Sequence, residues 1–299
     1  MSRSQDASGN ALEYAIVSQI AKDKGALIKK SQVLDTARHD FNSPSILNDE
    51  RGQLMDVAEK SVNHIFAMEK SLASSKNIEV EMQPDAKGQE GDPRDILLTF
   101  GKGELGISCK RNNETMKNPR LQRHNLNFWE MWRMDGNVSQ EYRDAIGVVF
   151  DYTDKEKNNG AQKWNEIKDL HGKVYIPVLL AVAKEFEEAI LSNDEICKQF
   201  VSYMVGVPDY YKVMAYLGKQ VVVQGFNFNG TLSCHRLSYP KKLFSVKPLR
   251  KTTIILCFDG GWVFSMRIHN AETKLGNSLK WDIKLIEHPA GLYSHCISL

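Results

Sequence analysis

An acidic and a basic residue lie at the two ends of a stretch that is typical of a β-hairpin. Asp95 precedes the apolar run 96–100, and Lys110 follows a second apolar run, 105–109. The turn 101–103, Gly-Lys-Gly, favours two antiparallel strands. Such a hairpin can bring the carboxylate near the lysine. We expect this pair to hold a divalent metal ion against a phosphodiester, which is the minimum that metal-assisted hydrolysis requires.

A phosphodiester is hydrolysed slowly because water must attack an anion and an alkoxide must leave. A divalent metal held by carboxylates neutralises the phosphate and lowers the pKa of a bound water. A neighbouring lysine can orient or deprotonate the nucleophile and stabilise charge in the transition state. Mg²⁺ suits such a site because it takes few protein carboxylates and keeps several waters. Side chains alternate along a strand, so Ser108 and Lys110 should point to the same side. We predict Asp95, Ser108 and Lys110 to be catalytic.

The order of these residues resembles the PD-(D/E)xK nuclease superfamily. In its motif an aspartate is followed, ten to thirty residues later, by an acid, any residue and a lysine. Asp95 and Lys110 have suitable spacing, but Ser108 occupies the acidic position. Some nucleases of this superfamily carry Ser-x-Lys and take the missing carboxylate from a helix.

Four other acids are candidates for the missing carboxylate. Glu104 shares the face of the serine but lies about 13 Å along the strand, which makes it a poor replacement. Glu13, on the first predicted helix, and Glu114, just beyond the second strand, are better candidates, and Asp92 could also contribute. A plain turn before the hairpin and a solvated Glu13 are the alternative interpretation. The predicted catalytic set includes Glu13, and the predicted metal ligands are Asp95, Glu13 and Asp92.

The segment that follows Lys110 is basic and rich in amide side chains. Arginine reads guanine and asparagine reads adenine through paired hydrogen bonds, while lysine and arginine contact phosphates. Because the segment begins at the predicted catalytic lysine, we expect it to bind DNA; a solvated charged loop is the alternative. A second basic stretch, 236–251, contains no acid. The predicted DNA contacts are Arg111, Asn113, Lys117, Arg120 and Arg123, with Arg267 and Asn270 from the C-terminal part, where an internal hydrogen-bond network is an equal alternative.

The composition fits an ordinary folded protein. The chain has 299 residues, of which 42% are hydrophobic and 25% are charged, and its formal net charge is +2, so any nucleic-acid surface must be local. The five cysteines lack CxxC spacing, which favours reduced thiols and disfavours zinc. The sequence contains no apolar run of about 18 residues and no signal-peptide core. We therefore expect no membrane contact and a cytoplasmic location.

The apolar pattern predicts helices first and strands later. A dense apolar run at 173–182 favours a buried strand, followed by a helix at 183–191. We predict a nuclease core at 1–215, with an inserted DNA-recognition segment at about 111–170. A β-rich region at 216–299 should contact DNA or pack on the core. The other predicted elements are helices within 10–72 and strands at 78–82, 221–223, 252–258 and 262–268.

Longer blocks of sequence resemble the HaeIII-type restriction endonucleases. They span nearly the whole chain in the same order and include GDPRDILL, ELGISCKRNNE, KVYIPVLLAVAKEFEEAI, YMVGVPDYYKVM and GWVFSMRIHNAET. The resemblance implies a Mg²⁺-dependent type II endonuclease that cuts double-stranded DNA at a short palindrome, 5′-GGCC in HaeIII-like enzymes. It assigns Asp95 and Lys110 to the active site, with Glu13 as a helix-borne carboxylate. The segment 111–119 has fewer histidines than members of this family, so the target could differ from GGCC.

The expected fold class is α/β (α+β), with a PD-(D/E)xK restriction-endonuclease-like core, a mixed central sheet flanked by helices and a β-rich C-terminal region. The expected function is that of a type II restriction endonuclease that uses Mg²⁺. We expect a homodimer because two-fold DNA sites suit two-fold proteins. The alternative is a nuclease-like DNA-binding protein without cleavage activity, which the serine at position 108 favours.

Overall fold

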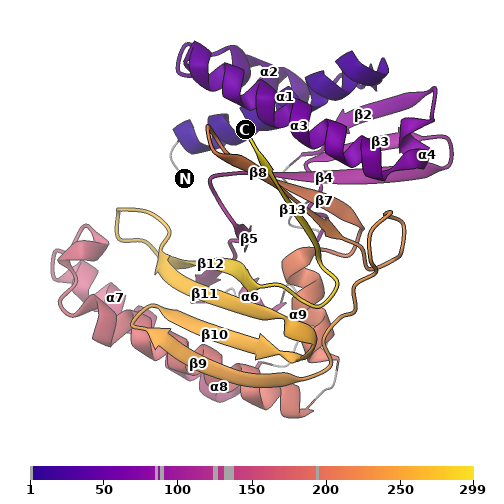
Figure 1. Ribbon diagram of the computed structural model, residues 1–299. Coiled ribbons are helices and arrows are strands. Elements are labelled where there is room, and N and C mark those ends of the chain that lie inside the picture. Colours follow the sequence, from indigo (N-terminus) through magenta and orange to yellow (C-terminus); the bar gives the residue numbers. More distant parts are fainter. Residues whose placement is uncertain (1–2, 85–86, 88–90, 124–126, 131–137, 193–194) are drawn as a thin grey trace. The chain divides into compact units, whose positions relative to one another are not determined.

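The computed structural model describes residues 3–84, 87, 91–123, 127–130, 138–192 and 195–299. These residues form two compact units, each with its own β-sheet and helices (Figure 1). The mixed α and β fold class that the sequence predicts is therefore confirmed. The first unit combines residues 1–114, 206–237 and 291–299, and the second combines 115–205 and 238–290.

The chain passes between the two units four times, after residues 114, 205, 237 and 290. Because each unit is discontinuous, neither coincides with the predicted core at 1–215 or with the predicted region at 216–299. Strands from the C-terminal part of the chain join both sheets. The predicted domain boundary between residues 215 and 216 stays a prediction. Within the predicted recognition segment, residues 124–126 and 131–137 lie outside the described residues.

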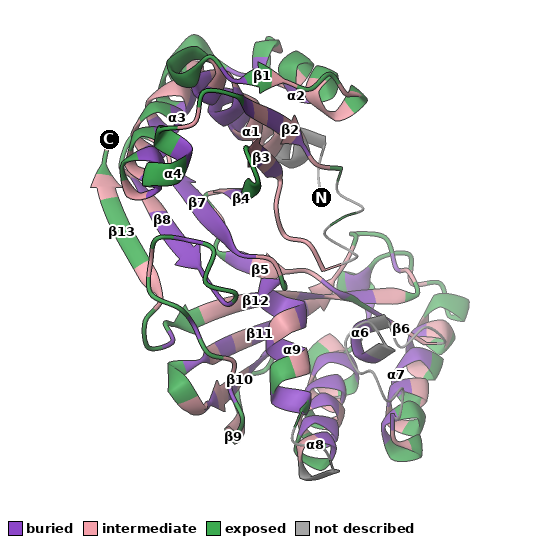
Figure 2. Ribbon diagram, turned by 90° about the vertical axis from the view of Figure 1, so that its right-hand side faces the viewer, coloured by how far each residue is buried: buried purple, intermediate pink, exposed green. Residues whose placement is uncertain are grey.

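The sheet of the first unit has seven strands in the order β1-β2-β3-β4-β7-β8-β13. β1 pairs with β2 and β4 pairs with β7 in parallel, whereas the other neighbours are antiparallel, so this sheet is mixed as predicted. β7 and β8 are mostly buried (Figure 2). The strands are β1 (Leu27–Ile28), β2 (Ile78–Met82), β3 (Ile96–Phe100), β4 (Gly103–Arg111), β7 (Tyr210–Tyr216), β8 (Gln220–Phe226) and β13 (Tyr293–Ser298).

β3 and β4 form the hairpin that the sequence predicts. Ile96 pairs with Ile107, and Phe100 pairs with Gly103. Gly101 in the turn has a φ of +57°, a left-handed conformation that glycine adopts without the steric cost of a Cβ. This register places Asp95, the residue before β3, beside the last residues of β4.

The described residues of the first unit form the helices α1 (Arg3–Lys24), α2 (Gln32–Asn42), α3 (Asn48–Met68) and α4 (Lys70–Ala73). The predicted helices within 10–72 are confirmed. The Ser31 hydroxyl caps α2 by accepting a hydrogen bond of 3.2 Å from the Leu34 amide. Buried side chains of α1 and α3, such as Leu12 and Val62, share one hydrophobic core with Ile107 of β4. α1 packs directly against β4, the strand that carries the predicted catalytic lysine.

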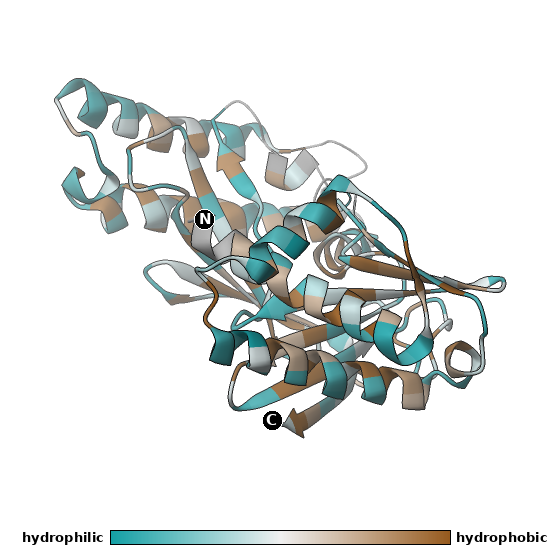
Figure 3. Cartoon of the chain, turned by 90° about the horizontal axis from the view of Figure 1, so that it is seen from above, coloured by the Kyte–Doolittle hydropathy of each residue, from teal (hydrophilic) through white to brown (hydrophobic). Residues whose placement is uncertain are grey.

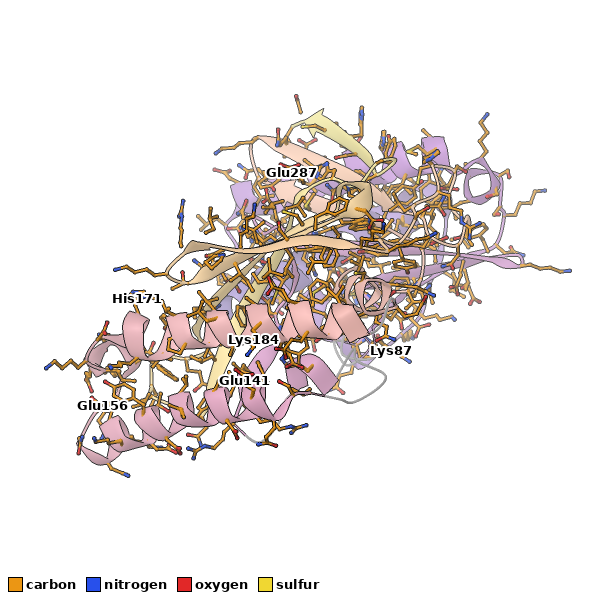
Figure 4. The ribbon with its side chains drawn as sticks, turned by 90° about the horizontal axis from the view of Figure 1, so that it is seen from below. Lys87, Glu141, Glu156, His171, Lys184 and Glu287 are labelled. Carbon is orange, nitrogen blue, oxygen red and sulfur yellow. The ribbon has the colours of Figure 1, made fainter. Side chains whose placement is uncertain are left out.

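The sheet of the second unit has the order β5-β12-β11-β10-β9, and β6 also pairs with β12. α8 packs against β9 and β10. α7 and α8 run side by side, and Glu141 of α7 forms an ion pair with Lys184 of α8 (Figure 4). Across the molecule, hydrophobic residues concentrate along the strands and hydrophilic residues are frequent along the helices (Figure 3). The elements are β5 (Thr115–Lys117), β6 (Arg120–Gln122), β9 (Leu243–Arg250), β10 (Thr253–Phe258), β11 (Val263–Asn270), β12 (Ser278–Glu287), α6 (Asn127–Glu130), α7 (Gln140–Asn158), α8 (Ile176–Ser192), α9 (Ile196–Val205) and the short helices Trp164–Glu166, His171–Tyr175 and Asp259–Gly261.

The prediction of a buried strand at 173–182 is wrong. This segment forms the short helix His171–Tyr175 and the first half of α8. Val174, Val178, Val182 and Phe186 are buried at intervals of four residues, which places them on one side of a helix. Pro177 lies just after the π-helical turn His171–Tyr175, which runs directly into α8. A dense apolar run does not by itself distinguish a buried helix from a buried strand.

The remaining predicted strands are confirmed. Residues 78–82 form β2, and the segments 221–223, 252–258 and 262–268 fall largely within β8, β10 and β11. Ile78, Val80 and Met82 of β2 are buried while the residues between them are partly exposed, as the alternating pattern predicts. Among the described residues, no helix has the length and apolar character needed to cross a membrane.

The two adjacent leucines of α8 provide a matched test of its helical structure. Leu179 is 2% exposed and Leu180 is 56% exposed. Leu179→Ala should lower the free energy of unfolding by about 2–5 kcal/mol, because it leaves a cavity. Leu180→Ala should change it by about 0.5 kcal/mol or less. Urea denaturation of both variants measures this difference, and equal losses would indicate a strand buried on both faces.

Candidate active site

The backbone of Asp95 is fixed on both sides before β3 begins. Its N–H donates to the carbonyl of Ile107 in β4 at 2.9 Å, and its carbonyl accepts from the amide of Gln83, just after β2, at 2.8 Å. These bonds extend the pairing of three neighbouring strands by one residue. The Asp95 side chain is therefore held beside the end of β4.

The Asp95 carboxylate is bound through one of its two oxygens. Oδ2 accepts hydrogen bonds from the Ser108 hydroxyl at 3.0 Å and from the Cys109 amide at 2.6 Å. Oδ2 also lies 3.6 Å from Nζ of Lys110. Within the part of the chain that the structure describes, no group contacts Oδ1. One carboxylate oxygen is thus used to hold the residue in place, and the other is available to a ligand.

Both charged side chains of this pair are open to solvent. The side chain of Asp95 is 24% exposed and that of Lys110 is 30% exposed, so a phosphate could approach them. The structure thus brings Asp95, Ser108 and Lys110 together, as strand alternation predicts. The catalytic roles of these three residues stay predictions.

Glu13 of α1 belongs to the same electrostatic neighbourhood. The negative charge of Asp95 raises the pKa of Lys110 above its ordinary value, and Glu13 raises it further, while burial opposes both. Burial, followed by the charges of Asp95 and Glu13, raises the pKa of the Cys109 thiol well above its usual range. Two carboxylates therefore act on the last residues of β4. Lys110 is therefore protonated at neutral pH, and the Cys109 thiol, whose pKa is raised most by burial, is neutral.

This donor set fits a hard cation such as Mg²⁺. Mg²⁺ needs only one or two carboxylates and retains several waters, and Asp95 and Glu13 can supply two. The described residues contain no cluster of three or more His, Cys, Asp or Glu side chains that could hold a metal. Two carboxylates with oxygen ligands only are compatible with the predicted magnesium ion.

The third predicted metal ligand, Asp92, is engaged elsewhere. Its carboxylate accepts hydrogen bonds from Nε and Nη2 of Arg94 at 2.8 and 2.7 Å. The remaining terminal nitrogen of Arg94 donates to Glu104 at 2.6 Å. The stem of Arg94 lies over Gly106, where an added Cβ would be 2.1 Å from Cδ of the arginine. Arg94 thus links the segment before β3 to the face of β4.

Glu114, the other candidate carboxylate, is held at the opposite side of β4. Its side chain accepts a hydrogen bond of 2.7 Å from the Tyr216 hydroxyl, and its carbonyl accepts one of 3.1 Å from Nζ of Lys212. Lys212 is a buried lysine that pairs with Ser108 across the parallel strands β4 and β7. No charge from Glu114 is among the causes of the raised pKa of Lys110. Glu13 is therefore the better second carboxylate.

Several predicted DNA contacts are neutralised by acids within their own unit. Arg111 forms an ion pair of 2.7 Å with Glu50 and also contacts Ser8. Arg123 forms ion pairs with Asp151 and Asp154 of α7. These partners lie far away in the sequence. They give both arginines a role in packing that residue type and local spacing do not reveal.

The other predicted DNA contacts differ in their surroundings. Lys117 lies 3.7 Å from the ring centroid of Tyr203, and burial lowers the pKa of Lys117 to about 8. Arg120 is exposed on β6, whereas Asn113 follows β4 in the first unit. Arg267 pairs with Asp282 at 2.7 Å.

Asn270 lies in an internal network, the alternative that the sequence left open. Its Oδ1 accepts from the Tyr175 hydroxyl at 3.4 Å, and its side-chain amide donates to the carbonyl of Glu272 at 2.6 Å. Its role as a DNA contact stays a prediction.

Two parts of the site were not expected from the sequence. The backbone amide of Cys109 cannot be recognised from residue type, because every residue except proline carries one. The position of Arg94 between the acids at positions 92 and 95 is a weak indication that it pairs with an acid.

The chain is similar to known restriction enzymes over most of its length. The sequence model described as HaeIII restriction endonuclease matches residues 9–289, a range that includes Glu13, Asp95 and Lys110. The chain is 30% identical over 312 residues to the type II restriction enzyme HaeIII of Haemophilus aegyptius, and the match covers 97% of this chain and 96% of that enzyme. No solved structure matches the chain.

The pKa of Lys110 tests the proximity of the two carboxylates. Asp95→Asn should lower this pKa, and Glu13→Gln should lower it less, because Asp95 is the larger cause of the raised value. A raised lysine pKa stabilises the fold below the ordinary value of 10.5, and this stabilisation is lost as the pH rises through the folded pKa. An NMR titration of the Lys110 side chain measures the change, with Glu59→Gln on α3 as the control of equal charge. An unchanged Lys110 pKa in Asp95→Asn would contradict the geometry.

The close approach of Arg94 to Gly106 yields a second test. Gly106→Ala should lower the free energy of unfolding by about 1–3 kcal/mol, because the new methyl group must displace the Arg94 stem. Gly52→Ala on α3 is the matched control. That position has open space around it, so alanine there should stabilise the helix by about 0.5–1 kcal/mol. Denaturation curves of both variants distinguish these outcomes, and a neutral Gly106→Ala would show that the arginine is not constrained.

Proposed function

The chain belongs to the HaeIII restriction endonuclease family and cleaves DNA at specific sites; we propose that it does so with Mg²⁺ held by Asp95 and Glu13, next to Lys110. The observation that carries this proposal is the bonding of Asp95. Its Oδ2 is bound by three consecutive residues of β4, and Oδ1 is left to a ligand. For type II restriction activity, a phosphate of the double-stranded DNA must then reach the metal ion that this carboxylate would hold.

When bound, the metal neutralises the phosphate charge and lowers the pKa of a bound water. The residues of the chain perform the remaining tasks. Asp95 and Glu13 supply the negative charge that holds the cation. Ser108 and the Cys109 amide fix the orientation of the Asp95 carboxylate, so that no rearrangement is needed during the reaction.

Lys110 acts as a cation in this proposal. Because the two carboxylates raise its pKa, it is protonated at neutral pH and donates hydrogen bonds. It can orient the attacking water and stabilise the charge that develops on the phosphate. We therefore propose a positioning and electrostatic role for Lys110.

Ser108 supports a neighbouring carboxylate in this arrangement. Its hydroxyl donates to Asp95 at 3.0 Å, while the second carboxylate comes from α1. The alternative of a DNA-binding protein without cleavage activity rested on this serine. The hydrogen bond to Asp95 supports a role for this hydroxyl within a cleaving site.

We further propose a short palindromic target, with 5′-GGCC as the first sequence to test, and a homodimer whose two-fold axis matches that of the DNA. Arg111, Asn113, Lys117, Arg120, Arg123, Arg267 and Asn270 remain predicted DNA contacts. Of these, Arg120 has the best support, because it is exposed and no carboxylate among the described residues forms an ion pair with it. A cytoplasmic location is part of the same proposal.

Plasmid cleavage in Mg²⁺ tests the assigned roles. Asp95→Asn should reduce cutting below detection, because it removes the charge of the central ligand. Lys110→Gln should slow cutting by about 10²–10³-fold, the usual effect of losing one preorganised group that stabilises charge. Both variants should still bind duplex DNA without metal. Lys102→Gln, in the turn of the same hairpin, is the matched control for Lys110 and should cut like the wild type. Wild-type rates in Asp95→Asn or Lys110→Gln would remove that residue from the mechanism.

A further inference from the structure

The sheet of the second unit has one apolar face and one polar face. On β10, β11 and β12 the burial alternates from residue to residue. Side chains such as Leu256, Met266 and Trp281 are fully buried, and α8 packs against this sheet at β9 and β10 (Figure 1). The residues between them point to the opposite side, because side chains alternate along a strand. We call this opposite side the open face.

The strand register places basic side chains from four strands on the open face. Lys280 of β12 pairs with Arg120 of β6 on one side and with His269 of β11 on the other. Lys284 of β12 pairs with Ser265 of β11, which in turn pairs with Ile255 of β10. Residues of one row share a face, so the cations of this face are Arg120, Lys247, Arg250, Arg267, Lys280 and Lys284.

Few acids balance these cations. Asp282 of the same face pairs with Arg267 at 2.7 Å and with His269 at 3.1 Å. Although burial alone would raise the pKa of Asp282, the hydrogen bonds from His269 and Arg267 lower it to about 2, so it stays ionised. Glu287 lies at the end of β12, where it pairs with Val263. Two acids thus face six cations among the described strands.

Three of the cations keep their charge available. Among the described residues, no carboxylate lies within ion-pair distance of Arg120, Lys247 or Lys280. Arg111 and Arg123, by contrast, are neutralised by Glu50 and by two aspartates. The open face therefore carries positive charge that no acid of the described chain neutralises. Five neighbouring strands spaced about 4.8 Å apart make this face about 19 Å wide.

We propose that the open face binds the phosphate backbone of duplex DNA, with Lys247 and Lys280 as phosphate contacts beside Arg120. This inference rests on the proposed function, which makes duplex DNA the substrate. Lysine and arginine bind phosphates by charge, and hydroxyl and amide side chains such as Ser265 and Gln122 can donate hydrogen bonds to them. A row of cations on a sheet binds the DNA backbone whatever the base sequence. This face therefore contributes affinity and orients the DNA, but it does not select bases.

The salt dependence of DNA binding tests the proposal. A double variant, Lys247→Gln with Lys280→Gln, should lower the slope of log Kd against log salt by about 1.8, because each lost phosphate contact accounts for about 0.9. Binding of a duplex is measured without divalent metal, which prevents cutting. The matched control is Lys155→Gln with Lys157→Gln, on α7 of the same unit, which removes the same charge and should leave the slope unchanged. Arg120→Gln alone should lower the slope by about 0.9.

The outcomes separate this inference from the proposed function. A wild-type protein that neither binds nor cuts duplex DNA overturns both. A wild-type protein that binds and cuts, together with a double variant of unchanged slope, overturns only the assignment of the open face. An equal loss of slope in the control pair would also overturn it, because the effect would then come from net charge alone.

Discussion

One carboxylate oxygen, Oδ2 of Asp95, connects most parts of the candidate active site. It accepts hydrogen bonds from the Ser108 hydroxyl and the Cys109 amide, and it forms an ion pair of 3.6 Å with the ammonium group of Lys110. A partly buried carboxylate is costly unless it is hydrogen-bonded, and bonds to a charged acceptor contribute about 1.5–3 kcal/mol each. This interaction holds only in the register that pairs Ile96 with Ile107, since a slip of one residue would turn Ser108 and Lys110 to the other face.

In the proposed metal site, the same oxygen accounts for a serine where related nucleases have an acid. An acid at position 108 would place a second negative charge beside Asp95. The serine instead donates a hydrogen bond, which leaves Oδ1 for the cation. The second charge then has to come from another element. α1 packs against β4 and brings Glu13, whose charge acts on both Cys109 and Lys110. Thus the helix, the hairpin and the family assignment support the same arrangement.

The sequence predicted those features that depend on neighbouring residues. The hairpin was predictable because its glycine turn and apolar runs are local, and the alternation along β4 placed Ser108 and Lys110 on one side. The segment 173–182 was misassigned because a dense apolar run lacks a polar face that would reveal its period. The discontinuous units could not be predicted, because pairings such as that of β13 with β8 join residues about seventy positions apart in the chain. Ion pairs between residues that are distant in the chain could not be predicted for the same reason. Arg111 and Arg123 look like DNA contacts by residue type, but Glu50 and Asp151 neutralise them from distant parts of the chain.

The most direct test of the central claim is the position of a bound metal. Crystals of the wild-type protein soaked in Mn²⁺, which substitutes for Mg²⁺ and scatters anomalously, would show it. We expect a peak about 2.1 Å from an oxygen of Asp95 and from the Glu13 carboxylate, with the Lys110 ammonium beside it. A metal bound by Asp92 or Glu114, or one that does not touch Asp95, would contradict the account.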